Sequence, residues 1–544
     1  MADQVMVARG PEAAGTRKRR KPLEFQNTGP PEIMAEEITY MGKIGGGCYG
    51  NVYKGKCRGQ EVAVKKLFKQ ELSEATIKEF RKEVEICSQL HHPNVVLFMG
   101  ACTKAGHLAI VTELMPKGSL ESLLHDPKNN ISLRQRLLMS KQVALGMNWL
   151  HRSNPPIIHR DLKPSNILVD GYLNCKVCDF GLSAIKETDY LQDKDSIPGT
   201  PLWMAPEVLL GKPLDEKSDV YSYAIVLWEI VTKEEPFPEF QSYREFKRAI
   251  CRSHTRPPIP ADTIPSLAHL MQVCWHREPT QRPSFAQIIP MLDVVIIDTT
   301  IADAAGATFW KNNFIGKENV EWGEFLPKLA TALGATVRDA EELQWRALKA
   351  VMAVQEVDES LRDPPYVVRM RRFGQVLGWF GPFDGSLVTR VEETLRSPWF
   401  FGDAEREEVE DLLRKQEPGT FLVRASTTVS TAFTITKVSR DRRVNHQRID
   451  YRPGAGYTIK LMTSAGKKLI QENVSLSKFI TDLSPHLFLR QPAPRWPYEA
   501  LFSEQPTNIE GYLVQEDGVD DEDYMADGPG SLAELGSSGA TMLH

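Results

Sequence analysis

Hydrophobic and polar residues are distributed differently in successive regions of the chain. From Ile38 to about Ile297, dense runs of β-branched residues come first and amphipathic helical stretches follow. Residues 298–395 have a mostly helical pattern, and in residues 399–490 strand-like alternation lies between two helical segments. The pattern predicts an α+β protein of more than one domain.

The two ends lack this pattern. Residues 1–35 are rich in Pro, Gly, Ala and charge and include a basic cluster at 17–21, whereas residues 503–544 are acidic and rich in Gly and Ser. Segments of this composition bury too little apolar surface to fold, so we predict disorder at both ends. For the basic cluster, a localisation signal or a contact with an anionic surface is the alternative.

Length, charge and cysteine usage narrow the class of protein. A chain of 544 residues is expected to contain about three or four structural units. Its net charge of −5 gives no overall basic field, so we expect no nucleic-acid partner. All cysteines lie between Cys48 and Cys274, which is unlike a disulfide framework. No signal peptide, myristoylation site or membrane span is evident, so we expect a cytoplasmic protein with reduced thiols.

A glycine-rich segment near the start of the first region fits the pattern G-x-G-x-x-G-x-V. In such a loop, glycines let the backbone approach phosphate oxygens, while the flanking strands hold the turn over a nucleotide. Lys65 follows on a β-branched strand and can reach the α- and β-phosphates, and we predict that Glu83 rather than Glu85 holds it. The residues of the predicted nucleotide loop are Ile44, Gly45, Gly46, Gly47, Cys48, Tyr49, Gly50, Asn51 and Val52.

Two further motifs carry the groups that phosphoryl transfer requires. Asp161, in His159-Arg160-Asp161, can accept the proton of an attacking hydroxyl group. Lys163, two residues later, can reach the γ-phosphate. Asn166, and Asp179 before Phe180-Gly181, supply oxygen ligands of the kind that Mg²⁺ prefers. These residues predict ATP and Mg²⁺ as cofactors.

These motifs, followed by Ala205-Pro206-Glu207, stand in the order found in the protein-kinase superfamily, which the chain resembles over about residues 38–297. The resemblance implies a bilobal fold, with Thr112 as the gatekeeper and the backbone from Glu113 to Met115 binding adenine. It further implies that Asp219 and Arg282 are buried charges that tie the C-terminal lobe together. The residues that match the stacked spine of an active kinase are Cys87, Phe98, His159 and Phe180.

The hydroxyl group that is phosphorylated is suggested by residues near the catalytic loop. Lys163 is typical of serine/threonine kinases, whereas Trp203-Met204 is similar to the tyrosine-kinase-like branch, some of whose members have dual specificity. We predict Ser/Thr phosphorylation as the primary activity and leave tyrosine phosphorylation open. Within the activation loop we expect Ser196 to be the main regulatory phosphorylation site, and Thr200 to bridge Asp161 and Lys163.

An arginine in the third region is expected to be partly buried. Strand alternation places Arg424 on the same face as Leu422, and a guanidinium there is costly unless an anion meets it. The segment resembles a Src-homology-2 (SH2) domain over about residues 399–490, which implies a central antiparallel sheet flanked by two helices. The resemblance implies phosphotyrosine contacts by Arg406, Arg424, Ser426, Thr427, His446 and Arg448. A buried salt bridge of Arg424 is the alternative.

The connector, residues 298–395, matches no catalytic pattern. Its aromatic residues, such as Phe309, Trp310 and Phe325, are expected to form a helical core. The segment loosely resembles EF-hand-like connectors that precede SH2 domains, but it lacks the ligand sequence for calcium, so we predict none. In the acidic tail, Tyr524 is a candidate ligand for the chain's own SH2 domain once it is phosphorylated.

The order of kinase region and SH2 region most closely resembles the SH2-bearing tyrosine-kinase-like kinases of amoebae, the Shk family. The resemblance implies phosphorylation of protein substrates in cytoskeletal and chemotaxis signalling, with recruitment to membranes through phosphotyrosine-containing partners. The alternative is a pseudokinase scaffold that only binds. A scaffold would be expected to have lost Lys65, Glu83, Asp161, Asn166 or Asp179, and none of them is missing.

Overall fold

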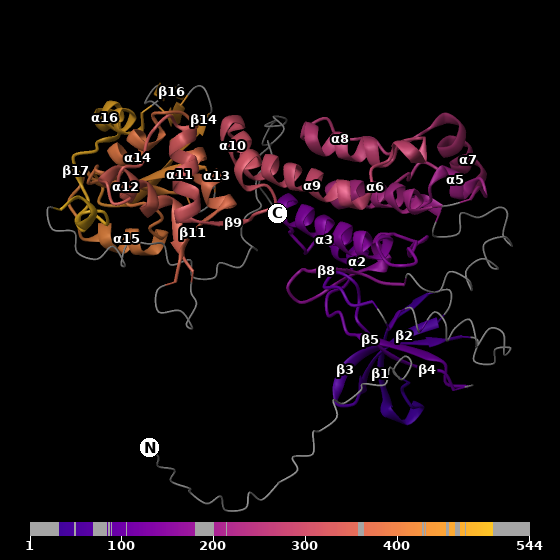
Figure 1. The fold of residues 1–544 in the computed structure, drawn as a ribbon. Coiled ribbons are helices and arrows are strands. Elements are labelled where there is room, and N and C mark those ends of the chain that lie inside the picture. Colours follow the sequence, from indigo (N-terminus) through magenta and orange to yellow (C-terminus); the bar gives the residue numbers. More distant parts are fainter. Residues whose placement is uncertain are drawn as a thin grey trace, which may run out of the picture. The chain divides into compact units, whose positions relative to one another are not determined.

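The computed structural model describes most of the chain (Figure 1). The described residues are 32–47, 50–68, 84, 87–88, 90–104, 106–179, 201–213, 215–356, 364–426, 429, 431–452, 456–462, 468–473 and 475–503. The predicted functional residues outside these ranges are Cys48, Tyr49, Glu83, Phe180, Ser196, Thr200, Thr427 and Tyr524. Described residues up to His91 form a first compact unit with Leu97–Leu114, and His92–Val96 form a second unit with the residues from Met115 onward.

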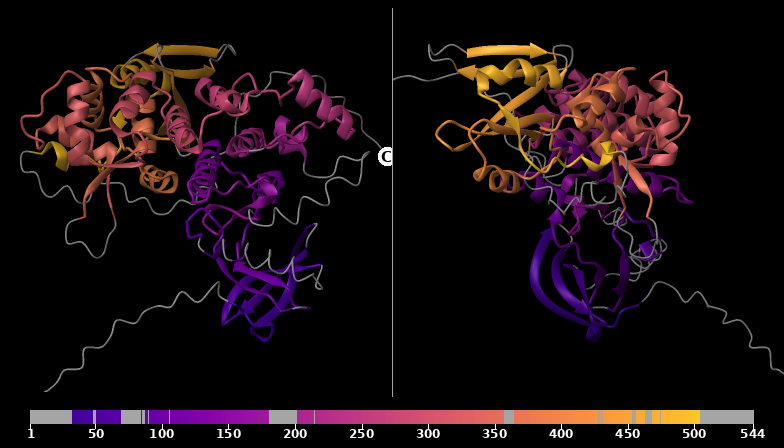
Figure 2. Two further views of the ribbon diagram at one scale, coloured as in Figure 1. Left: turned by 45° about the vertical axis from the view of Figure 1, so that its right-hand side comes forward. Right: turned by 90° about the vertical axis from the view of Figure 1, so that its left-hand side faces the viewer.

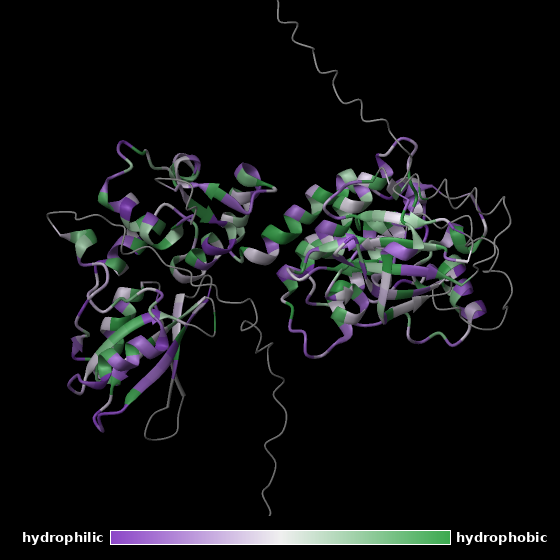
Figure 3. Cartoon of the chain, turned by 90° about the horizontal axis from the view of Figure 1, so that it is seen from below, coloured by the Kyte–Doolittle hydropathy of each residue, from purple (hydrophilic) through white to green (hydrophobic). Residues whose placement is uncertain are grey.

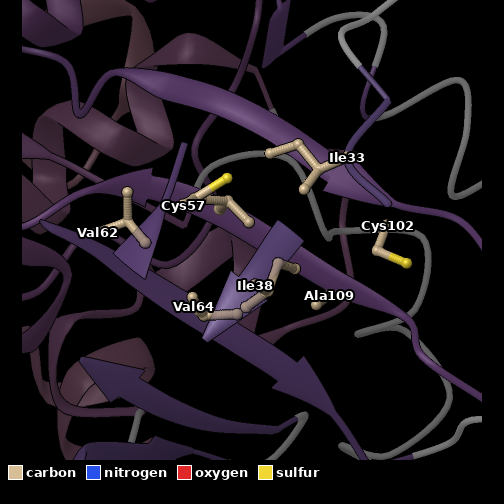
Figure 4. Packing of buried hydrophobic residues seen from close by; sticks show 8 residues of the cluster. Ile33, Ile38, Cys57, Val62, Val64, Cys102 and Ala109 are labelled. Carbon is tan, nitrogen blue, oxygen red and sulfur yellow. The ribbon is translucent and has the colours of Figure 1, made fainter. Parts of the chain in front are cut away.

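The first unit is built on an antiparallel sheet. Its strands, in their order across the sheet, are β1 (Ile38–Gly47), β2 (Gly50–Cys57), β3 (Gln60–Leu67), β5 (Ala109–Glu113) and β4 (Phe98–Cys102). On β3, Val62 and Val64 alternate with polar or smaller residues and are fully buried in one apolar cluster (Figure 4). The same cluster contains Ile33, whose N–H donates to Ala101 O at 3.0 Å. Because Ile33 fills an apolar site, ordered packing begins inside the segment 1–35 that we predicted to be disordered.

The second unit begins with a helical region that extends to residue 300. Its central helix, α6 (Glu216–Thr232), is buried continuously from Ser218 to Ile230, which is typical of a helix covered on all sides. The other helices of four or more residues are α2 (Leu120–His125), α3 (Leu133–His151), α5 (Pro206–Leu209), α7 (Tyr243–Arg248), η4 (Ala249–Ser253), α8 (Pro265–Cys274) and α9 (Phe285–Thr300). A small antiparallel sheet consists of β6 (Gly118–Ser119), β7 (Ile167–Val169) and β8 (Cys175–Val177).

The connector is mostly helical, as predicted, but it also contains a small sheet. Its helices are α10 (Ala304–Phe314), α11 (Trp322–Ala332), α12 (Leu343–Met352), α13 (Met370–Phe380) and α14 (Leu387–Leu395). Its antiparallel strands, in sheet order, are β10 (Ala353–Gln355), β11 (Tyr366–Arg369) and β9 (Asn319–Glu321). Strands of this length are too short to show a periodic pattern, so sequence reasoning missed them. The aromatic core predicted around Phe309, Trp310 and Phe325 is confirmed, because all three side chains are buried and their rings pack together.

The C-terminal module is a central, mainly antiparallel sheet with a helix on each face, and the predicted α+β class is thereby confirmed (Figures 1 and 2). Its strands, in sheet order, are β16 (Lys468–Asn473), β15 (Gly456–Met462), β14 (Val444–Arg452), β13 (Ala432–Val438), β12 (Thr420–Ala425) and β17 (Gln491–Pro492). Leu422 packs toward α15 (Arg406–Arg414), whereas Tyr457 packs against Phe479 of α16 (Leu476–Leu487). Since β17 and Tyr498, which stacks on Phe400, belong to this packing, the module extends past residue 490.

Hydrophobic and hydrophilic residues are mixed along these elements, as the colours of Figure 3 show. In the described ranges, no helix combines the length and the apolar character that crossing a membrane requires.

The connector and the C-terminal module share one hydrophobic core. Trp379 and Phe380, at the end of α13, lie with ring centroids 6.0 Å and 5.8 Å from that of Phe433 on β13. The hydroxyl of Tyr457 donates to Trp379 O. A Cβ atom added at Gly378 would lie 2.5 Å from Cγ2 of Thr431, so this contact requires glycine. The two segments are therefore expected to unfold together.

Replacing Trp379 with alanine tests this shared core. The Trp379→Ala variant is expected to lose about 3–5 kcal/mol of unfolding free energy, because the buried indole supports both segments. Pulse proteolysis along a urea gradient, following the fragment that contains residues 298–503, measures the change. Tyr172→Ala is the control, since Tyr172 is 88% exposed. Separate transitions for the connector and the module would contradict a common core.

Candidate functional site

The loop that carries Asp161 is held in place by the buried carboxylate of Asp219 on α6. Its Oδ2 accepts the backbone N–H of His159 at 2.8 Å and the Nε2 of His151 at 2.8 Å. Its Oδ1 accepts the backbone N–H of Arg160 at 2.9 Å. Arg160 has a left-handed backbone (φ 66°), a conformation that costs a non-glycine residue about 1 kcal/mol and is offset by these bonds. The structural role predicted for Asp219 is therefore confirmed.

The predicted catalytic residues of this loop lie together. Asn166 Nδ2 donates to the backbone oxygen of Asp161 at 2.7 Å and to Asp161 Oδ2 at 3.0 Å. Lys163 Nζ lies 3.3 Å from Asp161 Oδ1. The backbone N–H of Cys178 donates to Asn166 O at 3.0 Å, which places Asp179 directly after a residue bonded to the loop. The side chains of Asp161, Lys163 and Asn166 thus lie in contact, and Asp179 is tied to their loop through the backbone of its neighbour Cys178.

The donor set of the loop fits Mg²⁺. Because Asn166 Nδ2 is bonded to Asp161, the amide leaves Oδ1 as its group for a cation. Throughout the described ranges, no cluster of three or more His, Cys, Asp or Glu side chains could hold a metal alone. Mg²⁺ is usually held by one or two protein carboxylates, with phosphate and water oxygens completing its octahedral shell. Asn166 and Asp179 therefore suit a cation that arrives with a nucleotide.

In the first unit, the sheet positions the residues predicted to contact the nucleotide. Lys65 on β3 pairs across the sheet with Val52 on β2 and Ile110 on β5. A Cβ atom at Gly50 would lie 2.3 Å from Lys66 O, so the approach of β2 to β3 requires glycine there. The described members of the loop lie on β1 and β2, namely Ile44, Gly45, Gly46, Gly47, Gly50, Asn51 and Val52. Thr112 and Glu113 end β5, and Met115, in the second unit, is buried.

A second buried charge, Arg282, has the structural role predicted for it. Its NH1 and NH2 groups bind the two carboxylate oxygens of Glu207 at 2.6 Å and 3.0 Å. The same guanidinium donates to the backbone oxygens of His276 and Lys217. Buried charges are tolerated when they are paired and fully hydrogen-bonded in this way. The pair fixes α5, which directly follows the segment that contains Trp203.

A third buried charge was missed by sequence reasoning. Glu229 on α6 is 1% exposed, and its Oε2 accepts Nε1–H of Trp203 at 3.1 Å. Burial raises the pKa of the Glu229 carboxyl to about 8, the Trp203 hydrogen bond offsets part of this rise, and the charges of Glu121 and Glu235 add to it. His125 Nε2 lies 3.7 Å away. A glutamate within the apolar stretch from Tyr223 to Val231 was the signal available in the sequence.

In the C-terminal module, strand register places the predicted phosphotyrosine residues on one face. Arg424 on β12 lies opposite Thr434 on β13, which lies opposite Arg448 on β14. Residues directly opposite each other share a face, so Arg424 and Arg448 point toward the α15 side. His446, opposite Thr436, lies two residues along the same face. Arg406 begins α15 on that side, so the fold brings these predicted residues together.

Arg424 is the buried member of this set. Its side chain is 3% exposed, its NH1 donates to Ala425 O at 3.1 Å, and among the described residues its Nε finds no hydrogen-bond partner. Burial lowers the pKa of the Arg424 guanidinium, and the charge of Arg406 lowers it further. No carboxylate in the described ranges forms an ion pair with it, which disfavours the alternative of a buried salt bridge. Ser426, also buried, accepts the N–H of Val429.

Two acids within the set were not predicted. Glu410 Oε1 binds Arg406 Nε at 2.8 Å and His446 Nε2 at 2.9 Å. Asp450 Oδ1 lies 3.1 Å from Arg448 Nε. The four-residue spacing of Arg406 and Glu410 on a helix was a signal for their pairing, whereas the contact with His446 depends on how α15 packs against β14.

Comparison with known proteins agrees with this geometry. A protein-family model described as protein tyrosine and serine/threonine kinase matches residues 38–292, and the SH2 domain model matches residues 399–471. Dual specificity protein kinase shkC of Dictyostelium discoideum is 46% identical over 78% of this chain and 86% of its own length. Dual specificity protein kinase shkA of the same organism is 44% identical over 81% and 88%. Serine/threonine-protein kinase CTR1 of Arabidopsis thaliana is 46% identical over 48% and 32%.

The fold, the catalytic loop and these matches define a protein kinase that carries an SH2 domain on the C-terminal side of its catalytic domain. More particularly, the chain belongs to the family of SH2-containing kinases that includes the Dictyostelium shk proteins.

The raised pKa of Glu229 predicts how stability depends on pH. Because the folded pKa of about 8 exceeds the unfolded value of 4.5, the stability from burying neutral Glu229 is fully present below about pH 4.5 and is lost as pH rises through about 8. We expect the unfolding free energy to fall by about 2 kcal/mol more between about pH 6 and pH 9 in the native chain than in Glu229→Gln. Urea unfolding at the two pH values measures this difference.

His125→Gln is the control for titration of the neighbouring imidazole, and it is expected to retain the decline. The same pH dependence in Glu229→Gln and in the native chain would contradict a protonated Glu229.

Proposed function

We propose that this kinase transfers phosphate from MgATP primarily to serine and threonine and also to tyrosine hydroxyl groups of proteins, and that its SH2 domain recruits it to phosphotyrosine-containing complexes. The observation that supports transfer most directly is the assembled loop in which Asn166 and Lys163 both bind Asp161. Such an arrangement argues against the pseudokinase scaffold. The Dictyostelium relatives shkC and shkA are named as dual specificity kinases, which supports dual specificity, and the Arabidopsis relative is named as a serine/threonine kinase.

The chemistry of the loop suggests a role for each residue. Asp161 accepts the proton of the substrate hydroxyl group and orients its oxygen for attack. Lys163, beside Asp161, offsets negative charge that develops on the transferred phosphoryl group. Bound MgATP supplies that group, and Asn166 and Asp179 would hold the Mg²⁺ that screens its charge. Lys65 is proposed to bind the α- and β-phosphates from β3.

The buried guanidinium of Arg424 supports phosphotyrosine recruitment. An arginine that lacks a carboxylate partner gains most from an anion that accepts two parallel hydrogen bonds, as phosphate does. Binding to phosphotyrosine-marked receptors or cytoskeletal complexes would bring a cytoplasmic kinase to the membrane periphery. We propose this setting, with chemotaxis and cytoskeletal signalling as the context, on the basis of the family resemblance.

Phosphoamino-acid analysis of a generic protein substrate tests the proposed specificity. Phosphoserine and phosphothreonine are expected to dominate, with a smaller amount of phosphotyrosine. Asp161→Asn is expected to lower incorporation by about 10²–10⁴-fold, because the general base is lost. Asp262→Asn, an exposed carboxylate elsewhere in the same region, serves as the matched control. Phosphotyrosine alone would overturn the serine/threonine assignment, and equal labelling by Asp161→Asn would favour the scaffold.

Substituting Arg424 separates binding from folding. Arg424→Met is expected to weaken binding of a phosphotyrosine peptide by about 30-fold or more, because the buried charge that meets the phosphate is removed. Stability should be unchanged or higher, since an incompletely compensated buried charge is replaced by an apolar side chain. Fluorescence polarisation and thermal unfolding of the full chain give the two readouts. Arg443→Ala, whose side chain is 83% exposed, is the control, and undiminished binding by Arg424→Met would refute the assignment.

A further inference from the structure

Glu410 places a negative charge among the residues that would bind phosphotyrosine. It lies on α15 one helical turn after Arg406, and its Oε1 accepts the Nε–H of Arg406 at 2.8 Å. The same oxygen lies 2.9 Å from Nε2 of His446, which comes from β14. One carboxylate oxygen therefore binds both Arg406 and His446, although they belong to different elements.

This arrangement is more than a helix-surface ion pair. In isolated helices, an acidic residue four positions before a basic residue is the favourable order, and here the arginine comes first. Glu410 also reaches across to the sheet, where His446 is held from its other side by Thr436 Oγ1 at 3.1 Å from Nδ1. Both ring nitrogens of His446 therefore have partners. A phosphate that bound Nε2 of His446 would have to displace Glu410 from that nitrogen.

Charge at the site supports the same conclusion. Arg406 and His446 hold the pKa of the Glu410 carboxyl below its ordinary value, so this group is ionised at neutral pH. The charges of Glu410 and Glu405 act on buried Arg424 in the sense opposite to that of Arg406. Asp450 pairs with Arg448 in a similar way. Among the described basic residues of this face, Arg424 is the one without a carboxylate partner.

We propose that Glu410 is an internal counter-anion, which occupies Arg406 and His446 while no phosphotyrosine is bound and thereby lowers the affinity of the SH2 domain for its ligand. The inference rests on the proposed phosphotyrosine recognition. A phosphate dianion and the carboxylate compete for the same N–H donors, and where both remain near the site they repel each other. Binding is therefore weaker than the basic residues alone would give, and release is faster.

The consequence for signalling is brief recruitment. Affinity differences between closely related complexes lie mostly in the dissociation rate, so a counter-anion that competes for the same donors shortens the lifetime of the complex. A kinase held only briefly at each phosphotyrosine can sample many substrates. In this design, Arg424 provides recognition and Glu410 limits how long the complex lasts.

The Glu410→Gln variant of the full chain tests the proposal. Glutamine keeps the size of the side chain and an oxygen acceptor but removes the charge. A phosphotyrosine peptide is expected to bind about fivefold more tightly to Glu410→Gln than to the native protein, with most of the change in the dissociation rate. Fluorescence polarisation and surface plasmon resonance measure the two quantities. Glu410→Ala, which removes both charge and acceptor, should also bind more tightly.

Matched controls lie on the same helix. Glu407→Gln and Glu408→Gln make the same change of net charge at exposed positions, and affinity is expected to change by less than about twofold because solvent and salt screen these charges. Thermal unfolding of every variant confirms that it is folded.

The outcomes separate the two proposals. Failure of the native chain to bind the phosphopeptide would refute phosphotyrosine recruitment itself. If the native chain binds and Arg424→Met does not, then equal or weaker binding by both Glu410 variants would overturn the counter-anion and leave recruitment standing. Equal tightening by Glu407→Gln would also overturn it, because net charge rather than Glu410 would then be the cause.

Discussion

The energetic cost of burying a charged side chain explains how the catalytic loop and neighbouring segments of this kinase are held in place. A charged side chain removed from water must be paired or hydrogen-bonded, or else it destabilises the fold. Asp219 meets this requirement with three N–H donors. Two of them are backbone groups of the loop that carries Asp161, and the third is the imidazole of His151 at the end of α3. Arg282 meets it with Glu207. The compensation of a buried charge therefore holds the loop of Asp161 in the first case and α5 in the second.

The same rule bears on the site that we propose for phosphotyrosine in the C-terminal module. Arg424 is almost as deeply buried as Asp219, yet its Nε lacks a hydrogen-bond partner within the described residues. The phosphate of the proposed phosphotyrosine ligand would supply the missing partner. Glu229 illustrates a third solution, in which the pKa rises until the buried carboxyl is neutral. The three buried groups are thus accommodated in three ways: Glu229 is neutral, Asp219 is hydrogen-bonded, and Arg424 is left for the ligand that we propose.

The connector covers one face of the SH2 sheet. Because Trp379 and Phe380 pack against Phe433, one face of the SH2 sheet is covered by the connector, while the face with Arg424 lies on the α15 side. The connector is therefore a structural part of the C-terminal module and supports the apolar face of its sheet. This packing accounts for a long helical segment that carries no catalytic motif.

Much of the site follows from the sequence because local spacing dictates it. Asp161, Lys163 and Asn166 lie within one short loop, and strand alternation was enough to predict that Arg424 shares a face with Leu422 and is partly buried. In the structure its burial is nearly complete. The kinase and SH2 folds were likewise evident from ordered motifs, and the family was confirmed by its relatives.

Contacts between distant segments were decided only by the tertiary structure. The meeting of Glu410 with His446, of Glu229 with Trp203 and of Trp379 with Phe433 each depends on how a helix packs against a sheet or a loop. The short strands of the connector exist only because a neighbouring strand completes their hydrogen bonds. Periodicity along a chain reports which face of an element is apolar, but the partner of that face is chosen by shape and charge across the whole fold. For this reason the sequence determined the chemistry of the protein, and the tertiary structure determined how its charges are balanced.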